Sequence, residues 1–428
     1  MRNPCLFTGT GAALFCVLSF LSAPVLADEP DPVPASGPAV PKEEPKPVIG
    51  TSDAAPPPAP PEATQAEAEK KKEPFAFGDF TWLNGNSRQT KFPLETEAFT
   101  GQFMTDANYT FSASRPKDHS LVGSTTSGRT NEVQLSHIGV GGDFHYDNVR
   151  GRFMTQFGLY ATTTVRNDAS PSRGQGDLAN AYRYVTEAYG GYHINALNGI
   201  NLDAGIFMSY VGLCSYYDYE NWVYQESYVS ANTPWFFNGI RLQVYTSDKL
   251  KIEPWIINGW QSYGMFNEQP GLGLQVLWRP TELLSLVSNS YFGADVLNNP
   301  SRVRIHTDNS AQLRYYQDRK GVLSKGAFSV TVDAGCETGG GVTCTGGKKP
   351  AQSFLGFMVY NRLWFMKDTF ALTLGGGAIT NPGRYLVLLP PINGATAASG
   401  TPYSRRTLAT RSARGMARSR STSCRASS

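Results

Sequence analysis

Residues 99–111 read FTGQFMTDANYTF, a stretch in which apolar and polar side chains alternate. The odd positions hold Phe99, Phe103, Ala107, Tyr109 and Phe111, whereas most of the even positions are polar. A period of two places alternate side chains on opposite faces of an extended strand. The stretch therefore predicts a β-strand with one apolar face and one polar face.

The same alternation recurs along the chain, and no helical periodicity separates the repeats. We expect thirteen strands, starting near residues 99, 132, 149, 182, 199, 237, 250, 271, 282, 301, 323, 353 and 369. An uninterrupted series of alternating strands predicts an all-β fold.

The connections between the expected strands alternate between short and long. The short ones consist of turn-forming residues at 147–148, 195–198, 247–249, 279–281, 318–321 and 366–368. The long ones include 112–131, 166–181, 211–236, 334–351 and 378–403. Short turns at one end and long loops at the other are typical of outer-membrane barrels. The sequence thus predicts a transmembrane antiparallel up-and-down β-barrel of about 14–16 strands over residues 75–403.

A soluble β-sandwich also alternates, but several of the expected strands exceed the about 9–11 residues that a tilted strand needs to cross a membrane. Aromatic residues near strand ends fit the rings of Tyr and Trp that lie at membrane interfaces, although aromatics are enriched in strands generally. The candidates are Tyr146, Tyr160, Tyr182, Tyr184, Tyr210, Trp255, Trp260, Trp278 and Trp364.

The start of the chain reads as an export signal followed by a spacer. Residues 1–27 contain Arg2, an apolar run and the small residues before a cleavage site after Ala27. An uncleaved anchor is the alternative, but the apolar run is shorter than the roughly 20 residues of a spanning helix. Residues 28–74 hold 13 of the 28 prolines and predict a disordered periplasmic linker.

The sequence does not show which strand closes the expected barrel. Thirteen is an odd number, whereas bacterial single-chain barrels have even strand numbers, so a closing strand or strands are missing from the count. Residues 75–83 could add a strand or fold into the lumen. Residues 404–428 contain seven Arg and seven Ser but no acidic or aromatic residue, and we interpret this tail as an out-of-frame segment that replaces the closing strands.

Several segments resemble the outer-membrane β-barrel porins of the OmpL-like class. They are FAFGDFTWLNGNSRQ at 75–89, DAGIFMSYVG at 203–212, PWFFNGIRLQVY at 234–245 and NPGRYLVLLPPINGATAASGTPY at 381–403. The resemblance implies a pore-forming barrel and does not identify a solute. In that class the chain continues into further strands beyond the segment matched by 400–403, so the tail departs from the pattern.

The charged residues on the polar face are the candidate functional residues. An Arg at the middle of a lipid-facing surface costs about 2–4 kcal/mol, so we expect these side chains to line the lumen and bias ion passage. About half of them are expected only to pair with one another, and the Arg excess favours anions weakly. The lumen-lining set is Arg150, Arg152, Asp203, Arg241, Glu253, Arg302, Arg304, His306, Asp308 and Arg314, with Asp106 a further acidic member.

The cysteines and the glycine-rich segment give little evidence of chemistry. Cys336 and Cys344 share one glycine-rich loop, where a disulfide and two free thiols are both open alternatives. Residues 339–349 lack the spacing of a phosphate-binding loop, and the five His residues lack ligand spacing. The sequence therefore predicts no cofactor, no metal and no enzyme activity.

Together these features predict an outer-membrane porin that lets small hydrophilic solutes or ions diffuse through a charged lumen. The expected partners are membrane lipid and the solutes, with no nucleic acid, and a second copy of the chain is a further candidate. The alternative is a plugged barrel that acts as a surface-binding or structural protein, or an outer-membrane hydrolase. The long loop at 211–236 is the expected plug or binding surface in that case.

Overall fold

The computed structural model describes residues 15–19, 73–89, 91–113, 115, 119, 126–165, 168–224, 227, 229–383 and 385. The expected signal peptide apart from 15–19, the expected linker as far as residue 72 and the expected out-of-frame tail lie outside these residues. Those three interpretations stay predictions.

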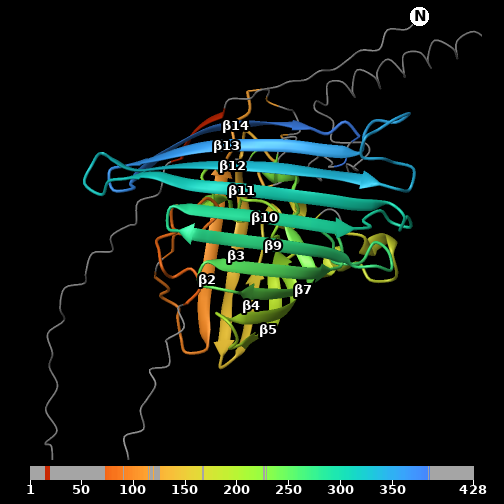
Figure 1. Cartoon of the computed structure of the whole chain (residues 1–428), viewed down its shortest axis with the longest axis horizontal. Coiled ribbons are helices and arrows are strands. Elements are labelled where there is room, and N and C mark those ends of the chain that lie inside the picture. The colour runs from red at the N-terminus through yellow and green to blue at the C-terminus, as the bar shows by residue number, and fades with distance from the viewer. Residues whose placement is uncertain are drawn as a thin grey trace, which may run out of the picture. The chain divides into compact units, whose positions relative to one another are not determined.

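Fourteen strands within the described residues form one sheet in the order β1, β14, then down through the numbering to β2. Apart from β1, each strand pairs antiparallel with its neighbours in chain order, so the predicted all-β, up-and-down fold is confirmed (Figure 1). The strands are β1 Phe15–Ser19, β2 Phe99–Tyr109, β3 Val133–Tyr146, β4 Val149–Thr155, β5 Val185–Ile194, β6 Ile200–Met208, β7 Phe236–Tyr245, β8 Leu250–Ile257, β9 Gly271–Thr281, β10 Leu284–Gly293, β11 Val303–Gln317, β12 Leu323–Thr338, β13 Ser353–Phe365 and β14 Phe370–Thr380.

The strand positions agree closely with the sequence prediction, but several bounds differ. β12 runs to Thr338 and β14 to Thr380, so the connections expected to begin at 334 and 378 begin later. The strand expected near residue 182 begins at Val185, because the short helix α2 (Leu178–Tyr182) precedes it. The turn predicted at 279–281 is wrong, since β9 runs to Thr281. Pro280 is accommodated there because the β9 and β10 ladder shifts register between Leu284 and Leu286, and an irregular strand end needs no N–H donor from proline.

The two edges of the series β2 to β14 run in the same direction. Each antiparallel step reverses the strand, and β2 and β14 are an even number of steps apart. Closing the sheet antiparallel therefore needs an odd number of additional strands. β1 meets this condition on one side, because Phe15–Ser19 pairs antiparallel with β14. Cleavage after Ala27, which stays a prediction, would remove β1.

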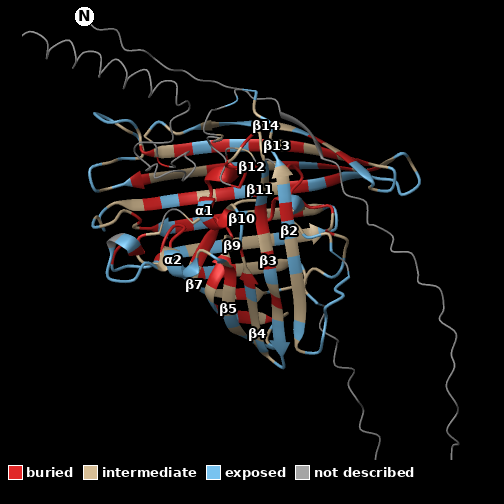
Figure 2. Ribbon diagram, turned by 180° about the vertical axis from the view of Figure 1, so that it is seen from behind, coloured by how far each residue is buried: buried red, intermediate tan, exposed pale blue. Residues whose placement is uncertain are grey.

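The sheet bends strongly, so that β2 to β5 cross behind β9 to β13 (Figure 1). Buried residues concentrate on the surface that this bend encloses, which we call the inner face (Figure 2). The opposite, outer face is rich in exposed apolar side chains, among them Phe103, Val140, Phe153, Ile256 and Leu355. This is the reverse of a soluble sheet, in which the apolar side is buried.

Short helices occur only in the long connections of the described residues. The β4 to β5 connection contains α1 (Tyr160–Thr163), η1 (Ser170–Ser172) and α2, and the β6 to β7 connection contains η2 (Asp218–Glu220) and η3 (Ser230–Asn232). Asp168 joins two of the long connections, since its Oδ1 accepts hydrogen bonds from the backbone N–H groups of Tyr263 and Gly264 at 2.9 and 3.0 Å. No helix in the described part of the chain is long and apolar enough to cross a membrane.

A charge on the outer face tests which surface meets lipid. Phe153 lies in β4 with its side chain outward and about half exposed (52%). We expect Phe153→Arg to lower the free energy of unfolding in lipid vesicles by about 2–4 kcal/mol, because an Arg in hydrocarbon is poorly solvated. Phe153→Leu is the control and should be nearly neutral. Urea titrations followed by heat-modifiable gel migration measure both, and equal stability of the two variants would contradict a lipid-facing surface.

Candidate functional site

The inner face is polar and charged, and strand alternation places its side chains there. Asp203, Glu253, Arg304, Asp308 and Asp333 are all at most 8% exposed, although all but Asp308 lie next to an outward apolar residue in their strand. Buried charges are tolerated only when they are paired or hydrogen bonded. The interior must therefore be organised by ion pairs.

One ion-pair group crosses the strands β4 to β7. In register, Arg150 lies opposite Gly191, Gly191 opposite Asp203, and Asp203 opposite Arg241. Asp203 is shared by two guanidinium groups, with Oδ1 3.4 Å from Arg150 Nε and Oδ2 2.9 Å from Arg241 Nε. Arg241 also lies over the ring of Phe207, 4.5 Å from its centroid. Asp203 thus holds both arginines against one wall.

Gly191 makes the shared pair possible. A Cβ at this position would lie 2.0 Å from Asp203 Oδ1, which is shorter than any non-bonded contact. The missing side chain is therefore what lets the Asp203 carboxylate reach across β5 toward Arg150.

Arg152 and Glu253 belong to two further groups on the same wall. Arg152 donates to Glu187 Oε2 at 2.5 Å, to Asp143 Oδ2 at 2.7 Å and to Gln102 Oε1 at 2.9 Å. Glu253 forms an ion pair with Lys251 and accepts a hydrogen bond from Gln243 at 2.9 Å.

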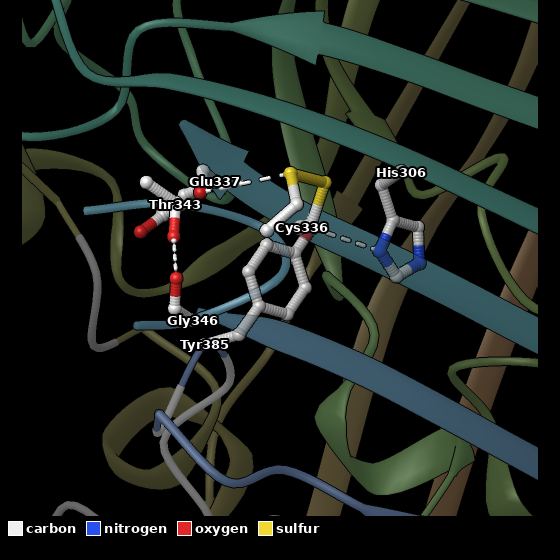
Figure 3. Close-up of a disulfide and its surroundings, with 7 residues drawn as sticks. His306, Cys336, Glu337, Thr343, Gly346 and Tyr385 are labelled. Carbon is white, nitrogen blue, oxygen red and sulfur yellow. Dashed lines mark hydrogen bonds between the residues drawn. A yellow bond between two sulfur atoms is a disulfide. The ribbon is translucent and has the colours of Figure 1, made fainter. Parts of the chain in front are cut away.

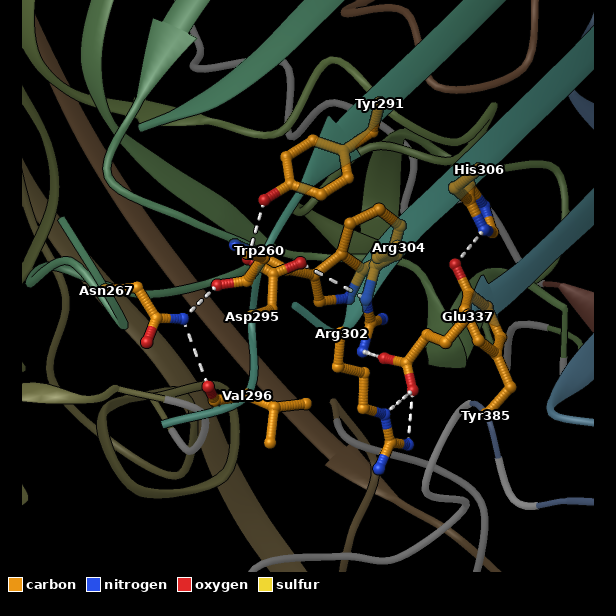
Figure 4. A network of polar contacts seen from close by, with 11 residues as sticks. Trp260, Asn267, Tyr291, Asp295, Val296, Arg302, Arg304, His306, Glu337 and Tyr385 are labelled. Carbon is orange, nitrogen blue, oxygen red and sulfur yellow. Dashed lines mark hydrogen bonds and ion pairs between the residues drawn. The ribbon is translucent and has the colours of Figure 1, made fainter. Parts of the chain in front are cut away.

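Two further predicted arginines meet at the opposite wall (Figure 4). Arg304 lies between two carboxylates, with Nε 3.2 Å from Asp295 Oδ2 and Nη2 2.8 Å from Glu337 Oε1. Arg302 pairs with the same Glu337. The Arg304 guanidinium is also enclosed by two rings, with its Cζ 4.8 Å from the centroid of Trp260 and 4.7 Å from that of Tyr385.

His306 and Asp308 follow Arg304 on the same face of β11. His306 Nε2 is 2.6 Å from Asp333 Oδ1, and its Nδ1 is hydrogen bonded to the Tyr385 hydroxyl at 2.9 Å (Figure 3). Asp308 accepts a hydrogen bond from Asn289 at 3.1 Å.

Arg314 completes the predicted set, and its Nη2 is 2.9 Å from Glu282 Oε1. All six predicted arginines therefore have a carboxylate partner, and the expected Arg excess is balanced by acids that the sequence prediction omitted. Those acids are Asp143, Glu187, Glu282, Asp295, Asp333 and Glu337.

The structure joins Cys336 and Cys344 in a disulfide at the end of β12 (Figure 3). Within the same loop Thr343 Oγ1 donates to the Gly346 carbonyl at 2.8 Å. No cluster of three His, Cys, Asp or Glu side chains with metal-binding geometry occurs among the described residues.

Residues 73–89 lie inside the bend and form no strand of the sheet. The sequence allows two alternatives for residues 75–83, an additional strand or a segment folded into the lumen. This segment begins near the short turn between β7 and β8, because Phe75 N donates to the Asp248 carbonyl at 2.8 Å. Trp82 is 1% exposed and packs with Met358 and Trp364 of β13. We call residues 73–89 the N-terminal insert.

The long connection 209–235 also packs against the inner face, and we call it the loop insert. Trp222 is completely buried and joins the two inserts, since its N–H donates to Asn84 Oδ1 at 2.6 Å and its Nε1 to the Trp82 carbonyl at 3.0 Å. The Trp222 carbonyl accepts a hydrogen bond from Thr373 Oγ1 of β14 at 3.0 Å. Strand alternation does not predict the contacts of either insert, because neither insert forms a strand of the sheet.

Both inserts contact the wall formed by β12 and β13, where Trp82 and Trp222 join a buried cluster with Ala327, Met358 and Trp364, and the interior charges differ in exposure. His306 and Asp333 on β11 and β12 have fully buried side chains, whereas Arg150 and Asp143 on β4 and β3 keep 30% and 42% of theirs exposed. Partly accessible charges thus occur on β3 and β4, near the short turn that connects them, and on the other wall at Arg302 (23%) and Glu282 (50%).

The loop insert contains a buried acid without an ion pair among the described residues. Asp218 is fully buried, and burial, followed by the neighbouring Asp106, raises the pKa of its carboxyl well above the usual range. Because the folded chain then holds a proton that the unfolded chain has already lost, the contribution of this carboxyl to stability is greatest at low pH. The free energy of unfolding falls as the pH rises above the ordinary carboxyl value of about 4.

We therefore expect Asp218→Asn to reduce the loss of stability between about pH 5 and about pH 8. Urea midpoints at both pH values measure this, and Glu268→Gln, at an exposed loop position, is the control. An unchanged pH dependence in Asp218→Asn would contradict a buried neutral carboxyl.

A second variant tests the shared carboxylate. Gly191→Ala should lower the free energy of unfolding by about 1–3 kcal/mol, because the new Cβ displaces Asp203 from Arg150 inside the protein. Gly190→Ala on the outer face is the control, since a Cβ there meets nothing within 4 Å. Equal denaturant midpoints of the two variants would show that the pair does not depend on Gly191.

Comparison with known proteins places the chain in context. The family model described as “Putative beta-barrel porin-2, OmpL-like” matches residues 98–408. No curated protein matches the chain. Among solved structures, one described as “Asymmetric conductivity of engineered proteins” is 12% identical, covers 58% of this chain and 90% of its own, and has a TM-score of 0.25.

Two mutants of the Rh. blastica porin are similar at the same level. The first is 11% identical, with 58% of this chain and 90% of that chain covered and a TM-score of 0.21. The second is 10% identical, with 66% of this chain and 99% of that chain covered and a TM-score of 0.25. Superpositions this weak carry no structural argument.

Proposed function

The chain belongs to the OmpL-like beta-barrel porin-2 family, and on that premise we propose that it lets small hydrophilic solutes and ions diffuse passively across the bacterial outer membrane. The observation that carries the proposal is the reversed sheet, with apolar side chains outside and paired charges inside. A surface of this kind suits lipid on one side and a polar passage on the other.

The proposed route follows the wall formed by β3 to β7. Arg150, Arg152, Asp203 and Arg241 lie there, and their side chains remain partly accessible except that of Asp203. The opposite wall is covered by the two inserts, which would narrow the passage and limit it to small solutes. In this proposal Glu253 of the next strand, β8, extends this wall, while Arg302, Arg304, His306, Asp308 and Arg314 mainly stabilise the covered wall.

The pairing of charges also bears on ion preference. An ion in a pore responds to the sum of nearby charges, and Asp203 pairs with two arginines while Arg152 pairs with two carboxylates. These groups nearly cancel. The proposal is therefore a pore with weak ion selectivity, in place of the anion preference expected from the Arg excess.

Single-channel recording in planar bilayers tests the proposal. We expect conductance steps that rise with salt concentration and a reversal potential near zero in a salt gradient. Arg150→Gln should shift the reversal potential toward cation preference, because Arg150 is the most exposed arginine of the wall. Arg314→Gln, at a side chain that is only 1% exposed on the covered wall, is the control and should shift it less than Arg150→Gln does. Absence of current from a folded protein would reject the porin proposal.

One observation favours a second candidate, a closed barrel with a structural or surface-binding role. Trp82 and Trp222 are almost completely buried, and the hydrogen bond from Trp222 Nε1 to the Trp82 carbonyl joins the two inserts. The inserts therefore resemble a fixed plug. Silence of the folded wild type, together with currents from Trp222→Ala, would support this candidate.

A further inference from the structure

The outer face carries a polar patch in the middle of β10 and β11. Ser288, Ser290 and Asn309 are exposed there, and Thr307 lies between them. Ser288 is in register with Asn309 and Ser290 with Thr307, so the four side chains form one cluster on two adjacent strands. Ser288 and Asn309 lie near the centres of their strands, far from the membrane interfaces where polar groups are hydrated.

Hydrogen bonds within the patch satisfy only part of its polar atoms. Ser288 Oγ donates to Asn309 Oδ1 at 2.7 Å, and Asn309 Nδ2 donates to Thr307 Oγ1 at 2.9 Å. An amide nitrogen carries two N–H donors and its oxygen has two lone pairs. Asn309 therefore keeps a donor and an acceptor site that face outward.

Lipid chains cannot take up these sites, because hydrocarbon neither donates nor accepts hydrogen bonds. A comparison with another strand is informative. Asn361 of β13 also lies outward, but its Nδ2 donates to the Tyr315 hydroxyl at 3.0 Å, and the same hydroxyl lies 3.2 Å from its Oδ1. Each of the two amides thus uses one N–H and its oxygen within its own chain, but Asn309 lines the depression described next and Asn361 does not.

The surface around the patch is also hollowed. Small and medium side chains line a depression of about 370 Å³, with Trp278 at one side and Ala311, Val330 and Val332 at the other. Small residues on a membrane-embedded surface let another protein surface approach closely. A depression that combines unsatisfied polar atoms with small residues is suited to protein contact.

We propose that this patch is the interface with a second copy of the chain. An amide has both a donor and an acceptor, so the patch complements itself when two copies are related by a two-fold axis. Asn309 then bonds to the patch of the partner, and the depression receives outward side chains from it. The proposal does not depend on whether the pore conducts.

The oligomeric state of the purified full chain in mild detergent tests the interface. Light scattering should give twice the mass of one chain for the wild type. Asn309→Leu should weaken association about tenfold, the effect of losing about 1.4 kcal/mol of buried polar contact. Asn361→Leu, a matched outward amide, should leave it unchanged. Heat-modifiable migration shows whether each variant is folded, and Ser288→Ala serves as a milder change at the patch.

Cross-linking in membranes gives an independent measurement. In chains whose cysteines outside the Cys336–Cys344 disulfide are replaced by serine, Asn309→Cys should form a disulfide-linked dimer on oxidation. Ile240→Cys, at an exposed outward position of β7, should not. The proposal is overturned by a wild type with the mass of a single chain, by equal cross-linking at both positions, or by a product containing a different protein.

Discussion

Hydrocarbon offers the backbone no hydrogen bonds, and the rest of this structure depends on that constraint. Each N–H and C=O group of β3 to β13 can be satisfied by a neighbouring strand, because those strands have partners on both sides. At the outer edge of β2 only the first residues are bonded, through the Glu95 to Thr100 bridge and the Gly101 N–H to the Leu94 carbonyl, and the rest of that edge has no neighbouring strand in the described part of the sheet. Since β2 and β14 run in the same direction, a closing strand has to be added between them. β1 occupies one side of that position, along β14.

The same constraint reverses the distribution of side chains and makes charge pairing compulsory inside. Asp203 is tolerated in the interior because Arg150 and Arg241 both reach it. Arg362 is different, since it forms no ion pair within the described residues and is instead bonded to Thr373 Oγ1 at 3.1 Å and to the Trp222 carbonyl. Removing the loop insert would leave this buried guanidinium without the carbonyl, at a cost of about 1–3 kcal/mol or more. The insert is thus part of the stable fold.

Strand alternation predicted the positions of the strands and which charges face inward, because both depend on local sequence. It could also have placed Trp255 inside, since this residue lies between the outward positions 254 and 256. It was instead expected at a membrane interface, as were Trp260, Trp364, Tyr160 and Tyr210, and all five are buried. For Tyr160 and Trp260, which lie in connections, alternation gives no information.

The pairing of charges could not be predicted because it depends on register. That Arg150 meets Asp203 across Gly191 follows from which residues of three strands lie opposite one another, and a shift by one residue would move every side chain to the other face. The acids contributed by turns and loops, Glu282 and Asp295, have no alternation signal at all. The sequence therefore identified the charged residues of the interior and not the balance between them.

The loop insert is part of the chain packed inside the bend, and it also contacts both sides of the seam, by which we mean the gap between β2 and β14. Tyr224 donates to Asp106 Oδ1 of β2 at 2.8 Å, while the carbonyl of Trp222, two residues earlier, is bonded to β13 and β14. The segment thus spans the two sides of the sheet that are not paired directly. A plug that braces this seam cannot leave the interior without loosening β2 from β14. A closing strand between them would take over the bracing, so that closure of the sheet and mobility of the plug are coupled.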